Sequence, residues 1–129
     1  MTITILLNSA MMPDEGLYIL QRVNREFFAE LIADAHRRGN LQSYIGYSET
    51  AQHVQSISGV PIQVNRAATQ LPDQALIAVC KLKYRVSDPA MKGQLQPNED
   101  DYEYYVATYD RDHLRWRIVS DESQSSQSA

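Results

Sequence analysis

The chain has 129 residues, of which 43% are hydrophobic and 22% charged, and its formal net charge is −4. This composition predicts one globular domain and excludes disordered, collagen-like and low-complexity chains. The longest apolar run, residues 3–7, is too short to span a bilayer and no basic leader precedes it, so we expect a cytoplasmic protein with no membrane partner. The acidic balance argues against long nucleic acid as a partner, because that ligand requires a broadly basic surface.

The N-terminal part of the chain begins with two segments typical of strands. Residues 2–7 are apolar and β-branched and end at Asn8 and Ser9, as a buried strand does. A turn is expected over residues 12–16, and residues 17–23 then alternate between apolar and polar side chains. We expect this second strand to fold back and pair with the first.

Two helices are expected next, each with signals at its ends. Asn24 is the expected N-cap of a helix over residues 25–38, in which apolar side chains recur at helical spacing until Gly39 ends it. Ser48 is the expected N-cap of a second helix over residues 49–58, which ends before a glycine and a proline. The apolar side chains of the second helix share one side, which predicts that it packs on a sheet.

Apolar and β-branched runs predict further strands over residues 41–45, 62–64, 75–82 with an extension towards 86, 103–109, and 114–119. Residues 87–101 contain two prolines and a glycine and predict a long loop, and the polar residues 110–113 predict a hairpin. The elements together predict one α/β domain over residues 1–119. The Ser- and Gln-rich residues 120–129 predict a disordered polar tail.

One turn and two arginines have the chemistry of an anion site. The N–H groups at the start of a helix attract anions, so the turn over residues 46–48 either holds a phosphate or is a plain strand-to-helix turn. Arg66 and Arg85 each either present a guanidinium to a phosphate or lie in solvent. The common nucleotide-binding and hydrolase motifs are absent from the sequence. Residue spacing alone therefore predicts only a small α/β domain with a candidate anion site.

No metal, cofactor or disulfide is predicted. Cys80 is a lone cysteine in an apolar run and is expected to belong to the core. His36, His53 and His113 lack the spacing of metal ligands. His53 lies within the second predicted helix, where it either titrates beside a bound phosphate or lies on the helix surface.

Four tyrosines crowd one predicted strand, at positions 102, 104, 105 and 109. Alternation along a strand directs some of them into the core and others towards the surface or an interface. Stacking on nucleic-acid bases is the alternative role for the second group.

Several short motifs, in the same order along the chain, match one family. They are Leu-Asn-Ser-Ala at 7–10, Ile-Gly-Tyr-Ser-Glu-Thr-Ala at 45–51, Gly-Val-Pro at 59–61, Val-Asn-Arg at 64–66, and the apolar strand that carries Arg85. On these motifs the chain resembles the small viral anti-CRISPR ring nucleases, which bind cyclic tetra-adenylate made by type III CRISPR systems. The resemblance implies a homodimer with a small mixed β-sheet flanked by helices, and a pocket across the two-fold axis that holds the cyclic ligand.

The resemblance also implies which residues form the site. The implied ligand-binding residues are Asn8, Ser9, Gly46, Ser48, Asn65, Arg66 and Lys81, and the implied catalytic positions are Tyr47, Arg85 and Asp88. The family's reaction needs no metal: a ribose 2′-OH attacks the adjacent phosphate in line, which leaves a 2′,3′-cyclic phosphate and a 5′-OH. Such a step requires positive charge around the crowded phosphorus and an acid for the departing 5′-oxygen.

The chain departs from the family at three of these positions. Tyr47 replaces the histidine that acts as the acid, and a phenol gives up its proton less readily than an imidazolium. Asp88 replaces a longer glutamate, and Lys81 replaces a glutamine and adds a charge that favours phosphate. Three functions remain open: a slow ring nuclease, a protein that sequesters the cyclic nucleotide intact, or a structural domain that shares the fold.

Overall fold

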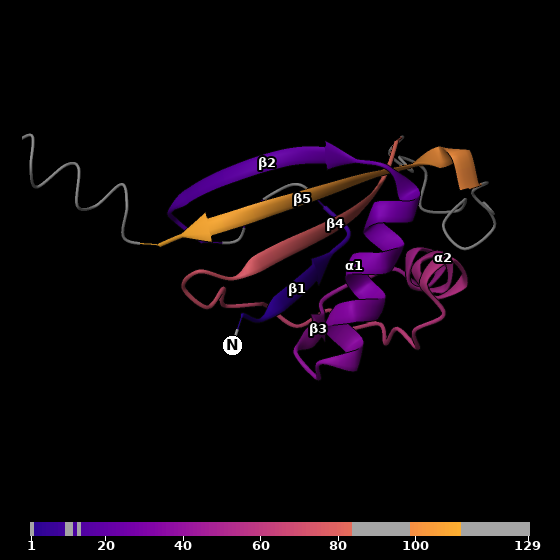
Figure 1. Cartoon of the computed structure of the whole chain (residues 1–129), viewed down its shortest axis with the longest axis horizontal. Coiled ribbons are helices and arrows are strands. Elements are labelled where there is room, and N and C mark those ends of the chain that lie inside the picture. The colour runs from indigo at the N-terminus through magenta and orange to yellow at the C-terminus, as the bar shows by residue number, and fades with distance from the viewer. Residues whose placement is uncertain (1, 10–11, 13, 84–98, 112–129) are drawn as a thin grey trace, which may run out of the picture.

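In the part of the chain that the structure describes, five strands form one sheet in the order β2-β5-β4-β1-β3 (Figure 1). The computed structural model describes residues 2–9, 12, 14–83 and 99–111. The strands are β1 Thr4–Leu7, β2 Leu17–Val23, β3 Leu41–Ser43, β4 Leu76–Leu82 and β5 Tyr102–Asp110. β1 pairs in parallel with β3 and β4, whereas β5 is antiparallel to β4 and β2. The sheet is therefore mixed, as predicted.

β1 lies inside the sheet, and all four of its residues are buried. The predicted pairing of the first two strands is wrong, because β1 has β3 and β4 as its neighbours and β2 pairs with β5 at the edge of the described sheet. The physical reason is the burial of β1 on both faces. A continuous apolar run is typical of a strand between two parallel neighbours, whereas a hairpin strand with one solvated face alternates.

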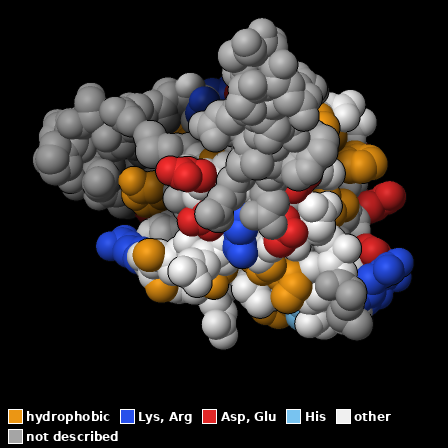
Figure 2. All heavy atoms as spheres, turned by 90° about the vertical axis from the view of Figure 1, so that its left-hand side faces the viewer, with side chains coloured by type: hydrophobic (Ala, Val, Ile, Leu, Met, Phe, Trp, Pro, Cys, Tyr) orange, Lys and Arg blue, Asp and Glu red, His pale blue; other side chains and the backbone are white. Residues whose placement is uncertain are grey.

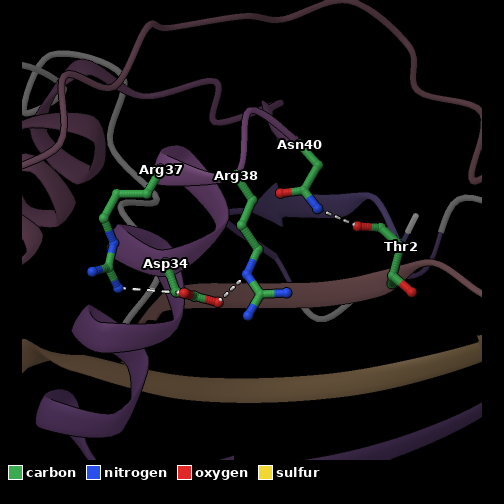
Figure 3. A network of polar contacts seen from close by, with 5 residues as sticks. All are labelled: Thr2, Asp34, Arg37, Arg38 and Asn40. Atoms are coloured by element: carbon green, nitrogen blue, oxygen red, sulfur yellow. Dashed lines mark hydrogen bonds and ion pairs between the residues drawn. The ribbon is translucent and has the colours of Figure 1, made fainter.

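α1 Arg25–Arg37 begins where the sequence predicts and ends one residue before the predicted Arg38, which is its C-cap. The Oδ1 of Asn24 accepts a hydrogen bond from the N–H of Phe27 at 2.8 Å, and Gly39 follows the helix in the left-handed region with φ 73°. Asp34 forms ion pairs with Arg37 at 3.3 Å and Arg38 at 3.0 Å in the last turn (Figure 3).

Asn40 joins the end of α1 to the start of β1. Its Nδ2 donates to the carbonyl of Thr2 at 2.7 Å (Figure 3). Its own carbonyl accepts from the N–H of Thr4 at 2.9 Å. These two bonds fix the register at which β3 enters the sheet beside β1.

α2 Ser48–Ser58 begins one residue earlier than predicted. Its N-cap residue is Tyr47 rather than Ser48, and within the described residues the Tyr47 side chain makes no capping hydrogen bond. Gly59 ends α2 in the left-handed region with φ 73°. α2 lies beside α1 near the end of the sheet towards which β1 runs (Figure 1).

The two faces of the sheet are covered in different ways. Both helices pack on one face, where Phe28, Ile32 and Val54 meet Leu6 and other buried residues of the sheet. The described residues that bury the opposite face are not helical, and its core is formed by Ile5, Leu7, Leu71, Ala75, Ile77, Val79, Ala107 and Tyr109. The chain is thus a small α/β domain whose described helices lie on one face.

Cys80 and three tyrosines follow the sequence predictions. The Cys80 side chain is fully buried, and burial raises the pKa of its thiol to about 12. Strand alternation divides the four tyrosines between the two faces of the sheet: Tyr102 and Tyr104 are buried on the face of the helices, and Tyr109 is buried on the opposite face, where Tyr105 is partly buried. The expectation that some of them lie at the surface is wrong, because both faces of the sheet are covered.

Four strand predictions differ from the structure or lie beyond the described residues. β3 ends at Ser43, and residues 62–64 form no strand, because side-chain bonds from Ser43 and Asn65 hold that segment instead of a ladder. The extension of β4 towards residue 86, the strand over residues 114–119 and the tail lie outside the described residues. Of the loop predicted over residues 87–101, residues 87–98 lie outside them too, and Glu99–Asp101 form the 3-10 helix η2. None of the described helices is long and apolar enough to cross a membrane.

Candidate functional site

Asn8, Gly46 and Arg66 meet where β1 ends and α2 begins, and we call this trio the Gly46 bracket. The N–H of Gly46 donates to the Oδ1 of Asn8 at 3.1 Å, and the carbonyl of Gly46 accepts from the Nε of Arg66 at 2.9 Å. Asn8 and Arg66 lie 38 and 20 residues from Gly46 in sequence. The structure therefore brings together three of the residues that the resemblance assigns to the site.

The hydrogen bond at Gly46 fixes which way the Asn8 amide faces. A backbone N–H needs an acceptor, so the oxygen of the amide must point to Gly46 and its NH₂ group must point elsewhere. Arg66 likewise uses one of its five N–H donors on the Gly46 carbonyl. The NH₂ group of Asn8 and the other N–H groups of the Arg66 guanidinium are donors suited to an anionic ligand. Arg66 is exposed.

Asn65 organises the segment that carries Arg66. Its side-chain Nδ2 donates to the carbonyl of Ser43 at 3.2 Å, its Oδ1 accepts from the N–H of Ala67 at 3.1 Å, and its backbone N–H donates to the carbonyl of Ile45 at 2.8 Å. These bonds tie the segment to the end of β3. The structure thus gives Asn65 a structural role, and its predicted contact with a ligand stays a prediction.

Tyr47 and Ser48 form the exposed start of α2. Tyr47 is 47% exposed, and Ser48 is the first residue of the helix. The first N–H groups of a helix have no partner within the helix and lie at the positive end of its dipole, which favours an anion. Glu49 in the first turn partly offsets this preference. The N–H of Gly46 is not part of this donor set, because it is bonded to Asn8.

Lys81 lies on β4, exposed, opposite Glu103 of β5. The Glu103 carboxylate accepts a hydrogen bond from the hydroxyl of Tyr105 at 2.7 Å and lies 3.9 Å from the guanidinium of Arg22. The Tyr105 hydrogen bond, followed by the charges of Arg22, Lys81 and Lys83, lowers the pKa of Glu103. Three basic residues therefore surround one carboxylate at the end of β4, an arrangement that the sequence did not indicate.

His53 is packed more closely than a residue on the helix surface. Its Nε2 lies 2.6 Å from the hydroxyl of Tyr104, and its ring stacks on Tyr102 with centroids 4.1 Å apart. Of the two alternatives that the sequence left open, a plain place on the helix surface does not fit these contacts, and a role beside a bound phosphate stays a prediction. The signal that was available is the alternation of β5, since positions 102 and 104 share the face on which α2 packs.

The remaining predicted site residues are Ser9, Arg85 and Asp88, and the structure describes only the first of them. Ser9 is exposed just after β1. Arg85 and Asp88 lie outside the described residues. Within the described part of the chain, no group of three His, Cys, Asp or Glu side chains is arranged to hold a metal ion.

Comparison with known proteins gives the family. A family model described as STIV B116-like matches residues 4–104 of the chain. The chain belongs to this STIV B116-like family. Its structure is similar to that of B116 of Sulfolobus turreted icosahedral virus, with a TM-score of 0.66 and 14% sequence identity over 81% of this chain and 97% of that chain. No curated protein matches the chain. At this identity the likeness to viral B116 shows a shared α/β fold.

Proposed function

We propose that the chain binds a cyclic oligoadenylate, most simply cyclic tetra-adenylate, and removes it by metal-independent cleavage. One observation carries the proposal: Asn8, Gly46 and Arg66 are assigned to ligand contact by the ring-nuclease resemblance, and they meet at the start of α2 although they come from three separate segments. Residues that bind one ligand have to converge in space, whereas residues that match short motifs by chance do not. The likeness to a viral protein is in keeping with an anti-CRISPR role.

The chemistry available at this end of the sheet suits a phosphodiester. The Arg66 guanidinium, the Asn8 amide and the first-turn N–H groups of α2 are all donors, and the site lies outside the carboxyl ends of parallel strands, where open α/β sheets commonly bind ligands. A second copy of the chain would supply the same donors again, so a two-fold pocket suits a ring of repeating units.

The proposed cleavage places Tyr47 at the leaving group. The ribose 2′-OH loses its proton to solvent, its oxygen bonds to phosphorus, and the bond from phosphorus to the 5′-oxygen breaks. The departing oxygen takes a proton, and the exposed phenol of Tyr47 at the start of α2 is the group proposed to donate it. Arg66 would offset the charge that develops on the phosphate.

Sequestration is the second candidate, and the identity of Tyr47 favours it. General acid catalysis contributes about 10²–10⁴-fold, so a phenol in place of an imidazolium makes cleavage slow while leaving the phosphate donors intact. A protein that holds the ring without cleaving it would remove the second messenger as well.

The experiment is to incubate the protein in EDTA with cyclic tri-, tetra- and hexa-adenylate and with a cyclic dinucleotide. Native gels report binding, and single-turnover product analysis reports cleavage. Conversion of cyclic tetra-adenylate to a 2′,3′-cyclic phosphate is the expected result, and tight binding of an intact ring identifies sequestration instead. Failure to bind any of the rings contradicts both functions and leaves a structural role.

A further inference from the structure

Gly46 is held on both of its peptide planes. The N–H that Asn8 accepts belongs to the plane shared with Ile45, and the carbonyl that Arg66 binds belongs to the plane shared with Tyr47. The two planes rotate about the α-carbon of Gly46, and glycine has the widest rotational freedom of any residue. Fixing both planes therefore fixes the φ and ψ angles of Gly46, and with them the direction in which the chain enters Tyr47.

The bracket also replaces a capping side chain. Helices usually begin at a residue whose own side chain accepts a hydrogen bond from the first turn, as Asn24 does for α1. Tyr47 makes no such capping bond among the described residues, although it is the N-cap of α2. The entry into α2 thus depends on side chains that come from the ends of β1 and of the segment after β3.

The glycine itself is not required by backbone strain. Its φ does not lie in the left-handed region that Gly16, Gly39 and Gly59 occupy. A Cβ on Gly46 would lie 3.6 Å from the Cγ of Arg66 and 4.0 Å from the Oδ1 of Asn8, which are ordinary contact distances. An alanine therefore fits, and the missing methyl group leaves space between the two side chains.

The geometry points to Asn8 and Arg66 as positioning residues, which hold both peptide planes of Gly46 and thereby set the direction of Tyr47 and the start of α2. They act as one unit, because each fixes only one of the two planes. The ligand used in the test, cyclic tetra-adenylate, rests on the proposed function, whereas the bracket itself is tested without ligand.

The first test is hydrogen exchange of the Gly46 amide in the ligand-free protein, followed by NMR. Asn8→Ala removes the acceptor, so exchange at Gly46 is expected to rise about ten-fold. Asn8→Asp keeps an oxygen at the same place and is expected to preserve the protection. Asn24→Ala is the matched control, because it removes a similar bond from an asparagine Oδ1 to a backbone N–H at the start of α1. Unchanged exchange at Gly46 in Asn8→Ala overturns the inference.

The second test is a double-mutant cycle on the affinity for cyclic tetra-adenylate. Residues that act through a shared partner are coupled. The fold-loss of affinity in the double variant Asn8→Ala/Arg66→Ala is therefore expected to be at least about three-fold smaller than the product of the fold-losses in the two single variants. Asn8→Ala combined with Arg37→Ala is the additive control, since Arg37 pairs with Asp34 on α1. Multiplicative losses for Asn8 and Arg66 overturn the inference. If the wild-type protein binds no ring, the proposed function fails, and the exchange measurement alone decides whether the bracket exists.

Discussion

The two ends of the sheet hold their backbone N–H groups with different acceptors, a neutral amide at one end and carboxylates at the other. At the end where α2 begins, a neutral amide and a guanidinium hold the backbone of Gly46. At the opposite end, where β5 finishes and β2 starts, carboxylates accept the backbone N–H groups: Asp14 accepts from the N–H of Leu71 at 2.6 Å, and Asp73 accepts from the N–H of Arg111 at 3.0 Å. The guanidinium of Arg111 donates to the carbonyl of Leu71, as Arg66 does to that of Gly46. Figure 2 views this opposite end, where acidic and basic side chains lie side by side.

The difference shows where an anion fits on a chain of net charge −4. The carboxylates of Asp14 and Asp73 repel phosphate, and the guanidinium of Arg111 at this end is bonded to the carbonyl of Leu71, so this end is a structural clasp that is less suited to a nucleotide. The end with Asn8 and Arg66 presents donors and a positive charge. Net charge alone argued against nucleic acid as a partner, whereas the distribution of charge between the two ends allows a small anionic ligand to bind locally.

The largest expected effect follows from changing the acid at the site end. Tyr47→His introduces an imidazolium where the proposed leaving group departs, and it is expected to raise the single-turnover cleavage rate of cyclic tetra-adenylate by about 10²–10⁴-fold. Product analysis by chromatography measures this rate. Tyr47→Phe is the control, because it keeps the ring and removes the hydroxyl. Equal rates for the wild type, Tyr47→His and Tyr47→Phe would show that position 47 is not near the reacting phosphate.

Removing the positive charge from the bracket is expected to have the next largest effect. Arg66→Ala should weaken the binding of cyclic tetra-adenylate by about 10–100-fold, as expected for the loss of a charge-assisted hydrogen bond. Fluorescence or calorimetric titration measures the affinity. Arg37→Ala removes an exposed arginine of α1 and should leave the affinity unchanged. Similar losses in the two variants would mean that overall charge, and not this end of the sheet, controls binding.

The clasp at the opposite end should affect stability and not binding. Asp14→Ala leaves the N–H of Leu71, a fully buried residue, without its acceptor and is expected to lower the free energy of unfolding by about 1–3 kcal/mol. Asp14→Asn retains an acceptor oxygen and should recover most of that loss. Urea denaturation measures both variants. A loss of ligand affinity in folded Asp14→Ala comparable to that of Arg66→Ala would remove the distinction between the two ends.

The smallest effect concerns Glu103, the carboxylate among the basic residues near the end of β4. Its pKa lies below the ordinary value chiefly because Tyr105 donates a hydrogen bond to it, so Tyr105→Phe is expected to raise that pKa. Because the pKa in the folded state is depressed, this interaction stabilises the protein above the pKa of the unfolded chain and is lost as pH falls through the folded value. An NMR titration of the side-chain carboxyl carbon detects the change, and an unchanged titration in Tyr105→Phe would assign the shift to the basic residues alone.

Local elements of this fold were predictable, whereas pairing across the sheet was not. Asn24 and Gly39 carry the signals for the ends of α1 within a few residues of the helix, so its position was correct. The pairing of β1 was wrong because the alternation of β2 says nothing of its partner, which is β5, more than seventy residues later in the sequence. The start of α2 was misplaced by one residue because Asn8 and Arg66, which are distant in sequence, set it.

The candidate site likewise has parts that the sequence indicated and contacts between distant residues that it did not. The turn over residues 46–48 and Arg66 were suggested by their chemistry as parts of an anion site, whereas Asn8 was added by the resemblance, since nothing in the local pattern links Asn8 with Arg66. The contacts of His53 with Tyr104 and of Glu103 with Arg22 escaped prediction for the same reason, because each joins residues from different elements.

The most direct test of the account is an NMR titration of ¹⁵N-labelled protein with cyclic tetra-adenylate in EDTA. The account predicts that the amide signals of Asn8, Gly46, Tyr47 and Ser48 shift on binding, while those of Asp14, Leu71 and Asp73 stay in place. Shifts concentrated at Asp14, Leu71 and Asp73, or no shifts at saturating ligand, would contradict the central claim that the end of the sheet at α2 binds the anionic ring.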